Sequence, residues 1–129
     1  MIFKVALTMT VLFIGFGCQT PKIAYYVEEV NDDNCTEGYY RLKLKAVTSD
    51  SIFQVLSIKT DNIELVQKTI NEGDILKIRI VKTKMSDWNL ENLNMRSHNY
   101  FFYCDDKIIL KSNECFYKSE KIIGLKLVQ

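Results

Sequence analysis

Residues 40–46 alternate between apolar side chains and the basic residues Arg41, Lys43 and Lys45. Successive side chains of a β-strand point to opposite faces of its sheet, so this pattern is typical of a strand with one buried face. We therefore predict a strand here, with a basic face that is exposed to solvent.

Residues 52–59 and 75–82 predict two further strands. In the second of these, Leu76, Ile78 and Ile80 face inward, and Lys77 and Arg79 face outward. In the first, the residues that share one face are Ile52, Leu56 and Ile58. Turn-forming residues at 49–51, 60–62 and 71–74 separate the segments.

The alternation is lost over residues 83–98, where we predict one or two turns of helix. Ser86 is a candidate N-cap, and Asp87 suits the first helical turn. Three apolar residues follow near helical spacing, namely Trp88, Leu90 and Leu93.

Strand patterns return at residues 100–104, 107–111 and 115–128, with turns at 105–106 and 112–114. In the last segment Ile123, Leu125 and Leu127 share a face. About six strands and one short helix predict a mainly β fold, namely a small antiparallel barrel that is similar to the OB type. The alternative is an immunoglobulin-like or other β-sandwich, because alternation does not distinguish closed from open sheets.

The N-terminal segment has a different character. Lys4 precedes an apolar run over residues 5–16, and polar residues follow from Gln19. A basic residue before an apolar run of this length is typical of a secretory signal peptide. The run is shorter than the about 20 residues of a membrane-spanning helix. An uncleaved anchor or a buried helix is the alternative.

The apolar run ends in Gly15-Phe16-Gly17-Cys18, which resembles the lipobox of bacterial lipoproteins. The resemblance covers residues 1–18 only. It implies that residues 1–17 are removed and that Cys18 becomes the first mature residue, with a diacylglyceryl group and palmitate-type acyl chains. Gln19, in place of the Asp typical of inner-membrane retention, implies an outer-membrane lipoprotein that faces the periplasm.

We predict that residues 18–38 form the lipidated cysteine and an acidic tether, and that residues 39–129 form a single β domain. Residues 25–27 are the part of the tether that has the character of an edge strand. The segment removed with the signal contains one base, Lys4, and no acid, so the mature chain has a formal charge of zero. A neutral domain suits a tethered protein better than a freely diffusing one.

Three cysteines follow Cys18, namely Cys35, Cys104 and Cys115. In an oxidising compartment two of them are expected to pair and one to remain a thiol, and the sequence leaves the pairing open. The same residues with His98 offer a metal site or a Cys-His dyad. Their spacing matches no zinc pattern and no nucleophile signature, so we expect no metal, no cofactor and no catalytic residue.

The exposed residues of the basic strands form a candidate binding patch, together with aromatic residues of segment 100–103. The patch residues are Arg41, Lys43, Lys45, Lys77, Arg79, Tyr100 and Phe102. The alternative is a solvated strand face whose lysines deter aggregation. An export signal argues against nucleic acid as the ligand, so we expect a protein or an anionic glycan.

These patterns predict a lipid-anchored envelope protein that acts as a binding or adaptor module and is not an enzyme. Phosphate-binding loops, nucleophile elbows and metalloprotease motifs are absent from the sequence. Two alternatives stay open: a periplasmic inhibitor or immunity-type protein, and a secreted domain that carries disulfides and no lipid.

Overall fold

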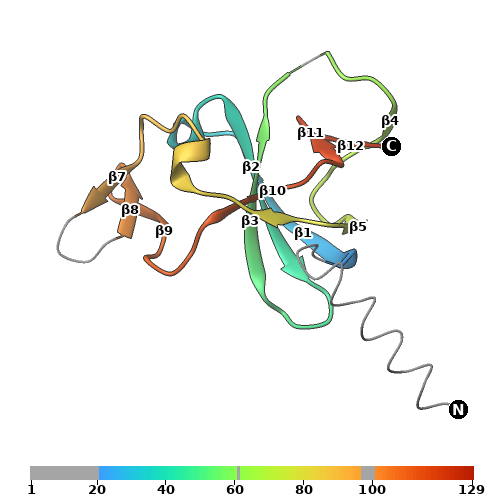
Figure 1. The fold of residues 1–129 in the computed structure, drawn as a ribbon, viewed down its shortest axis with the longest axis horizontal. Coiled ribbons are helices and arrows are strands. Elements are labelled where there is room, and N and C mark those ends of the chain that lie inside the picture. Colours follow the sequence, from blue (N-terminus) through green and yellow to red (C-terminus); the bar gives the residue numbers. More distant parts are fainter. Residues whose placement is uncertain (1–20, 61, 97–100) are drawn as a thin grey trace, which may run out of the picture.

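The computed structural model describes residues 21–60, 62–96 and 101–129 of the chain, and these residues fold mainly into β-strands (Figure 1). The strands are β1 (Ile23–Asn31), β2 (Tyr39–Ala46), β3 (Ile52–Ile58), β4 (Val66–Thr69), β5 (Ile75–Ile78), β6 (Val81–Lys82), β7 (Asn94–Arg96), β8 (Phe101–Cys104), β9 (Lys107–Leu110), β10 (Phe116–Lys118), β11 (Ile122–Ile123) and β12 (Lys126–Val128). Two short 3₁₀ helices accompany them, η1 (Asn34–Thr36) and η2 (Met85–Asp87).

The largest sheet has six strands in the order β5-β1-β2-β3-β10-β6. Strands β1, β2 and β3 form an antiparallel meander, whereas β10 runs parallel to β3. The predicted strands at residues 40–46 and 52–59 are therefore confirmed as β2 and β3. The parallel pair departs from the all-antiparallel arrangement that the sequence analysis predicts.

Strand β1 corrects the predicted domain boundary. Residues 23–31 were expected to lie in an acidic tether, but they form a strand that pairs with β5 on one side and with β2 on the other. Tyr25 and Val27 are buried on the face opposite Tyr26. The charged residues that suggested a tether, Glu28 and Glu29, lie at a β-bulge where the register of β1 shifts. The domain therefore includes residues from Ile23 onward.

The predicted strand at residues 75–82 is divided into β5 and β6. Its inward residues Leu76, Ile78 and Ile80 are buried as expected, and Lys77 and Arg79 are exposed. However, β5 pairs with β1 at one edge of the sheet and β6 pairs with β10 at the other edge. None of the sheets formed by the described residues closes into a barrel. The OB-like barrel is thus not confirmed, and the β-sandwich alternative fits.

The inner face of the six-stranded sheet carries the larger core. Cross-strand neighbours such as Leu42 and Val55 share this face because their positions alternate with exposed ones. The strands β11, β12 and β4 form a second sheet, and Ile122, Leu125 and Leu127 pack against this core. At about 25 cal/mol per Å² of apolar surface, this burial is the main stabilising contribution to the fold.

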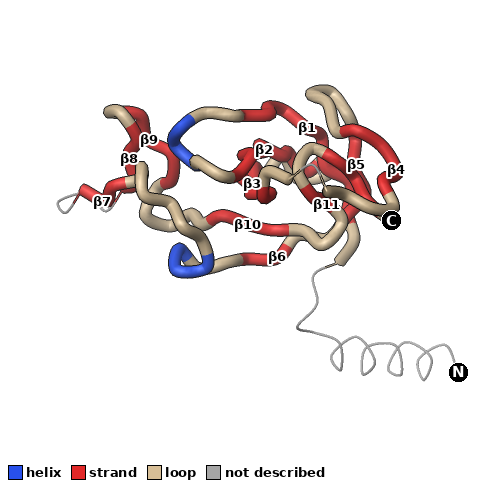
Figure 2. The backbone as a smooth tube through the Cα atoms, turned by 90° about the horizontal axis from the view of Figure 1, so that it is seen from above, coloured by secondary structure: helices blue, strands red, loops and turns tan. Residues whose placement is uncertain are grey.

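The outer face carries a second, smaller core. The third sheet, β7-β8-β9, lies to one side of the six-stranded sheet with η1 nearby (Figure 2). Leu56 and Phe116 of the large sheet pack with Cys104, Ile109 and Leu110 of this region. We call β7, β8 and β9 the cap sheet, because it covers one end of the outer face.

Two local predictions need correction. Over residues 83–96, the described part of the segment expected to be helical, there is only the single turn η2, whose N-cap is Lys84 rather than Ser86, and then strand β7. The predicted strand at residues 115–128 is three short strands. Its last two form a hairpin around Gly124, where φ is +58° and a Cβ would lie 3.3 Å from Ile63 Cδ1.

Candidate functional site

The candidate site is the seam where the cap sheet meets the outer face of the large sheet. Gln54 of β3 crosses this seam, and its Nε2 donates a hydrogen bond to the carbonyl oxygen of Ile109 at 2.7 Å. The alternation of β3 directs Gln54 outward, whereas Val55 points into the inner core. Gln54 therefore connects the two sheets at the centre of the seam.

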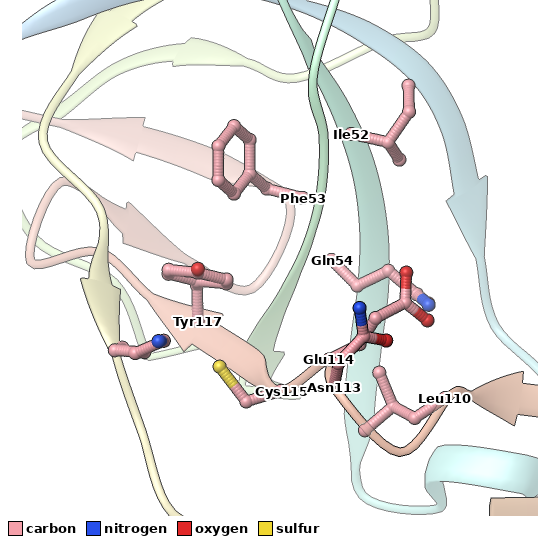
Figure 3. Close-up of a pocket in the computed structure, with 9 residues that line it drawn as sticks. Ile52, Phe53, Gln54, Leu110, Asn113, Glu114, Cys115 and Tyr117 are labelled. Carbon is pink, nitrogen blue, oxygen red and sulfur yellow. The ribbon is translucent and has the colours of Figure 1, made fainter. Parts of the chain in front are cut away.

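Two hollows flank Gln54. The first has a volume of about 190 Å³ and is lined by Ile52, Phe53, Gln54, Lys82, Leu110, Asn113, Glu114, Cys115 and Tyr117 (Figure 3). The second has a volume of about 150 Å³ and is lined by Glu29, Asn31, Arg41, Lys43, Gln54, Lys107, Ile108 and Ile109. Both are smaller than the roughly 300–1,000 Å³ typical of small-molecule sites. Such shallow hollows suit side chains of a partner better than an enclosed substrate.

Cys115 is the free thiol of the described residues, and it lies in the first hollow. Its sulfur is directed toward Tyr117 (Figure 3). Burial raises the pKa of Tyr117, and the charge and hydrogen bond of Cys115 raise it further. Tyr117 also packs edge-on against Phe53 at a centroid distance of 5.1 Å. The phenol is therefore neutral at physiological pH and contributes an uncharged wall to the hollow.

The disulfide joins Cys35 to Cys104, with a Cα–Cα distance of 5.4 Å. It is one of the pairings that the sequence left open, and it leaves Cys115 as the predicted odd thiol. It connects the loop between β1 and β2 to the last residue of β8. The bridge thus fixes the cap sheet to the large sheet beside the seam. Cys18 lies outside the described residues.

Arg41 does not belong to an exposed patch, contrary to the prediction. Only 3% of its surface is exposed, and its guanidinium makes two hydrogen bonds to Asp33, at 3.1 and 3.2 Å. Burial opposes ionisation of Asp33, but the hydrogen bonds and charge of Arg41, together with the Cys35 amide, outweigh burial and lower the pKa of Asp33. The pair fixes the loop that carries the disulfide.

Lys43 and Lys45 of the predicted patch are each opposed by a carboxylate. Lys43 lies 4.0 Å from a Glu28 oxygen, and Lys45 lies 3.7 Å from one of Asp50, both near the surface. Phe102 packs against the second core rather than facing solvent, and Tyr100 lies outside the described residues. Lys77 and Arg79 are exposed at the β5 edge.

A surface of which the sequence indicated only Lys45 and Lys77 lies on the part of the outer face beyond the cap sheet. Ile75, Tyr26, Lys45 and Ile52 are successive cross-strand partners on β5, β1, β2 and β3, so they form one row. Lys77 lies beside Ala24 in the next row, and the Val47 amide donates to the Ala24 carbonyl. Recognition of this surface requires the strand order, which the sequence does not contain.

Among the described residues, no group of three or more His, Cys, Asp or Glu side chains is arranged to hold a metal ion. His98 of the hypothetical metal site lies outside them. The described part of the chain also contains no helix that is long and apolar enough to cross a membrane.

Comparisons with known proteins return no match: the chain fits no protein-family model, and it resembles no curated protein and no solved structure at a significant level.

Proposed function

We propose that the chain is a lipid-anchored protein of the bacterial cell envelope whose β domain acts by binding a protein or an anionic glycan. The observation that carries this proposal is the disulfide between Cys35 and Cys104. Disulfides persist in oxidising compartments, such as the periplasm, and are rare in the cytosol. The bridge therefore agrees with the export signal of residues 1–17 and with lipidation at Cys18. Gln19 favours the outer membrane.

The seam is the proposed binding site of the domain. Its two hollows lie beside a cap sheet that the disulfide holds in place. The first hollow is lined by charged and aromatic side chains, and the second by charged and aliphatic ones. A rigid support reduces the entropy lost on binding. The small volumes of the hollows favour a surface-binding partner, so we place the protein among adaptors rather than enzymes.

We also propose that the large sheet is the wall of an OB-like barrel. The support is that β5 and β6, at its two edges, are separated in the chain by Arg79 and Ile80 alone. A sheet whose edge strands follow one another so closely in the chain has to curve back on itself. Protection of backbone amides on both sides of Arg79 against hydrogen exchange is expected for a curved, nearly closed sheet.

The anchor is tested by the intact mass of the protein from native membranes, measured with and without reductant before alkylation. The expected mass begins at Cys18 and includes acyl chains. One thiol, that of Cys115, is alkylated without reductant, and three are alkylated with it. A Cys18→Ser variant is expected to lose the acyl mass, whereas Cys115→Ser retains it. A mass without acyl chains and with all four cysteines paired would establish the secreted, unlipidated alternative instead.

The seam is tested by a photo-crosslinking residue placed at Asn113, which lines the first hollow, and in a control protein at Glu120, which lies outside it. Both positions are exposed, so neither substitution disturbs the core. A crosslinked product formed in native membranes from position 113 and not from position 120 is expected. Equal products from both positions would contradict the seam as the binding site.

A further inference from the structure

We propose that the exposed part of the outer face, around the start of β1, rests on the anionic bilayer surface that holds the lipid anchor. This inference depends on the proposed lipidation of Cys18. We call the surface the amphipathic patch, and its residues are Tyr26, Lys45, Val47, Ile52, Ile75 and Lys77.

Only a short length of chain lies between the proposed anchor at Cys18 and the domain. Strand β1 begins at Ile23 and is paired with Ile78 from its first residue. Only five residue steps separate Cys18 from Ile23, which span at most about 18 Å when fully extended. A domain of about 100 residues has a radius of gyration of about 13 Å, so this link is shorter than the diameter of the domain. The surface around the start of β1 therefore stays close to the bilayer.

The amphipathic patch combines exposed apolar side chains with lysines. Tyr26, Ile52, Ile75 and Val47 are between 41% and 62% exposed, although each is a large apolar or aromatic side chain. The register places three of them in one row across four strands, with Lys45 between Tyr26 and Ile52. Apolar and aromatic side chains beside lysines are typical of surfaces that bind at the interface of a membrane.

Basic residues lie at and beside the amphipathic patch. Lys22, Lys77 and Arg79 are exposed, and no carboxylate of the described residues lies within ion-pairing distance of them. Two carboxylates lie nearby: Asp50 lies 3.7 Å from Lys45, and Glu28 of β1 lies 4.0 Å from Lys43. Basic residues near a bilayer are attracted by anionic headgroups. The unpaired bases beside β1 therefore favour anionic lipid over a second copy of this chain, which would bring like charges together.

The test is acetylation footprinting of the full mature protein, with the reactivity of each lysine measured by mass spectrometry. The lipidated protein is compared in detergent micelles and in vesicles of phosphatidylethanolamine and phosphatidylglycerol. In the vesicles, Lys45 and Lys77 are expected to react at least about threefold more slowly, because contact with the headgroups excludes the reagent. Lys111 and Lys121, which are exposed elsewhere on the domain, should be unchanged.

A charge-reversal variant, Lys77→Glu with Arg79→Glu, tests the role of the anionic headgroups. Both side chains are exposed, so the fold is expected to be retained. In vesicles the reactivity of Lys45 should return to its value in micelles, while Lys121→Glu, the control variant, leaves the protection of Lys45 unchanged.

The outcomes separate this inference from the proposed function. If the intact mass of the protein shows no acyl chains, both the lipid anchor and the contact of the patch with the bilayer are wrong. If acyl chains are present but Lys45 and Lys77 react equally in vesicles and micelles, lipidation at Cys18 is supported. The proposed contact between the amphipathic patch and the bilayer is then wrong. Protection in micelles that increases with protein concentration would instead assign the patch to a contact between two copies of the chain.

Discussion

The Arg41–Asp33 pair shows how a single buried residue departs from its sequence pattern. Arg41 occupies an outward position of β2, as the alternation predicts, but its side chain is buried and Asp33 neutralises its charge. Asp33→Asn should lower the free energy of unfolding by about 1–3 kcal/mol, because it leaves a buried guanidinium without a carboxylate. Urea denaturation measures this change. Asp32→Asn, which removes the exposed ion pair with Lys59, should cost less than about 1 kcal/mol.

The same pair predicts a pH dependence. The pKa of Asp33 is lower in the folded protein than its ordinary value of 3.8. A carboxylate of this kind stabilises the fold fully above its unfolded pKa, and the contribution is lost as the pH falls through the folded pKa. The difference in stability between the wild type and Asp33→Asn should therefore be constant near neutral pH and decrease below about pH 4. A difference that stays constant down to pH 2 would contradict the assigned role of Asp33.

Strand β1 is the element that most changes the predicted domain. Val27→Ala should lower the free energy of unfolding by about 2 kcal/mol, because Val27 is fully buried in the inner core. Tyr26 precedes Val27, and its side chain lies on the opposite, exposed face. Tyr26→Ala should therefore lower the free energy of unfolding by less than about 1 kcal/mol. Thermal or urea unfolding of the two variants compares them. If both variants changed the free energy of unfolding by equal, small amounts, residues 23–31 would be a tether and not part of the domain.

The disulfide acts on two elements at once, since it fixes the β1–β2 loop to β8. The cysteines are separated by 69 positions in the chain. Closing a loop of that length stabilises a fold by about 4 kcal/mol in the chain-entropy treatment. The double variant Cys35→Ser, Cys104→Ser should lose an amount of this order in equilibrium denaturation. Cys115→Ser is the matched control, and its unfolding midpoint is expected to remain close to that of the wild type.

At the scale of the whole molecule, two cores lie on opposite faces of one sheet. The inner core includes Tyr25, Leu42 and Leu76, and the outer core includes both disulfide cysteines. Reduction of the disulfide should therefore increase hydrogen exchange in β8 and β9 while β1 and β2 remain protected, because local stability follows local packing. Exchange measured by mass spectrometry with and without reductant tests this. A uniform increase across all strands would show that the two cores unfold together.

The strands that were predicted correctly are those in which local pattern and tertiary burial agree. In β2 and β3 one face packs on the inner core, so period-two alternation identifies them. β1 was foreseen only as edge-strand character over residues 25–27, because the bulge beside Glu28 interrupts its alternation and the adjacent acids suggest solvent. The segment at residues 75–82 was predicted as one strand because nothing local marks a change of pairing partner between β5 and β6. The helix at residues 83–98 was overestimated because cap-sheet pairing competes with helical spacing.

The sequence by itself determined the mainly β class, the positions of β2 and β3, and the expectation of one disulfide and one free thiol. These depend on side-chain period and residue type, which are local properties. The tertiary structure decided the domain boundary, the choice of Cys104 as the partner of Cys35, the burial of Arg41, and the row from Ile75 to Ile52. Each of these depends on which strands are neighbours, and strand order comes from contacts between residues far apart in the chain.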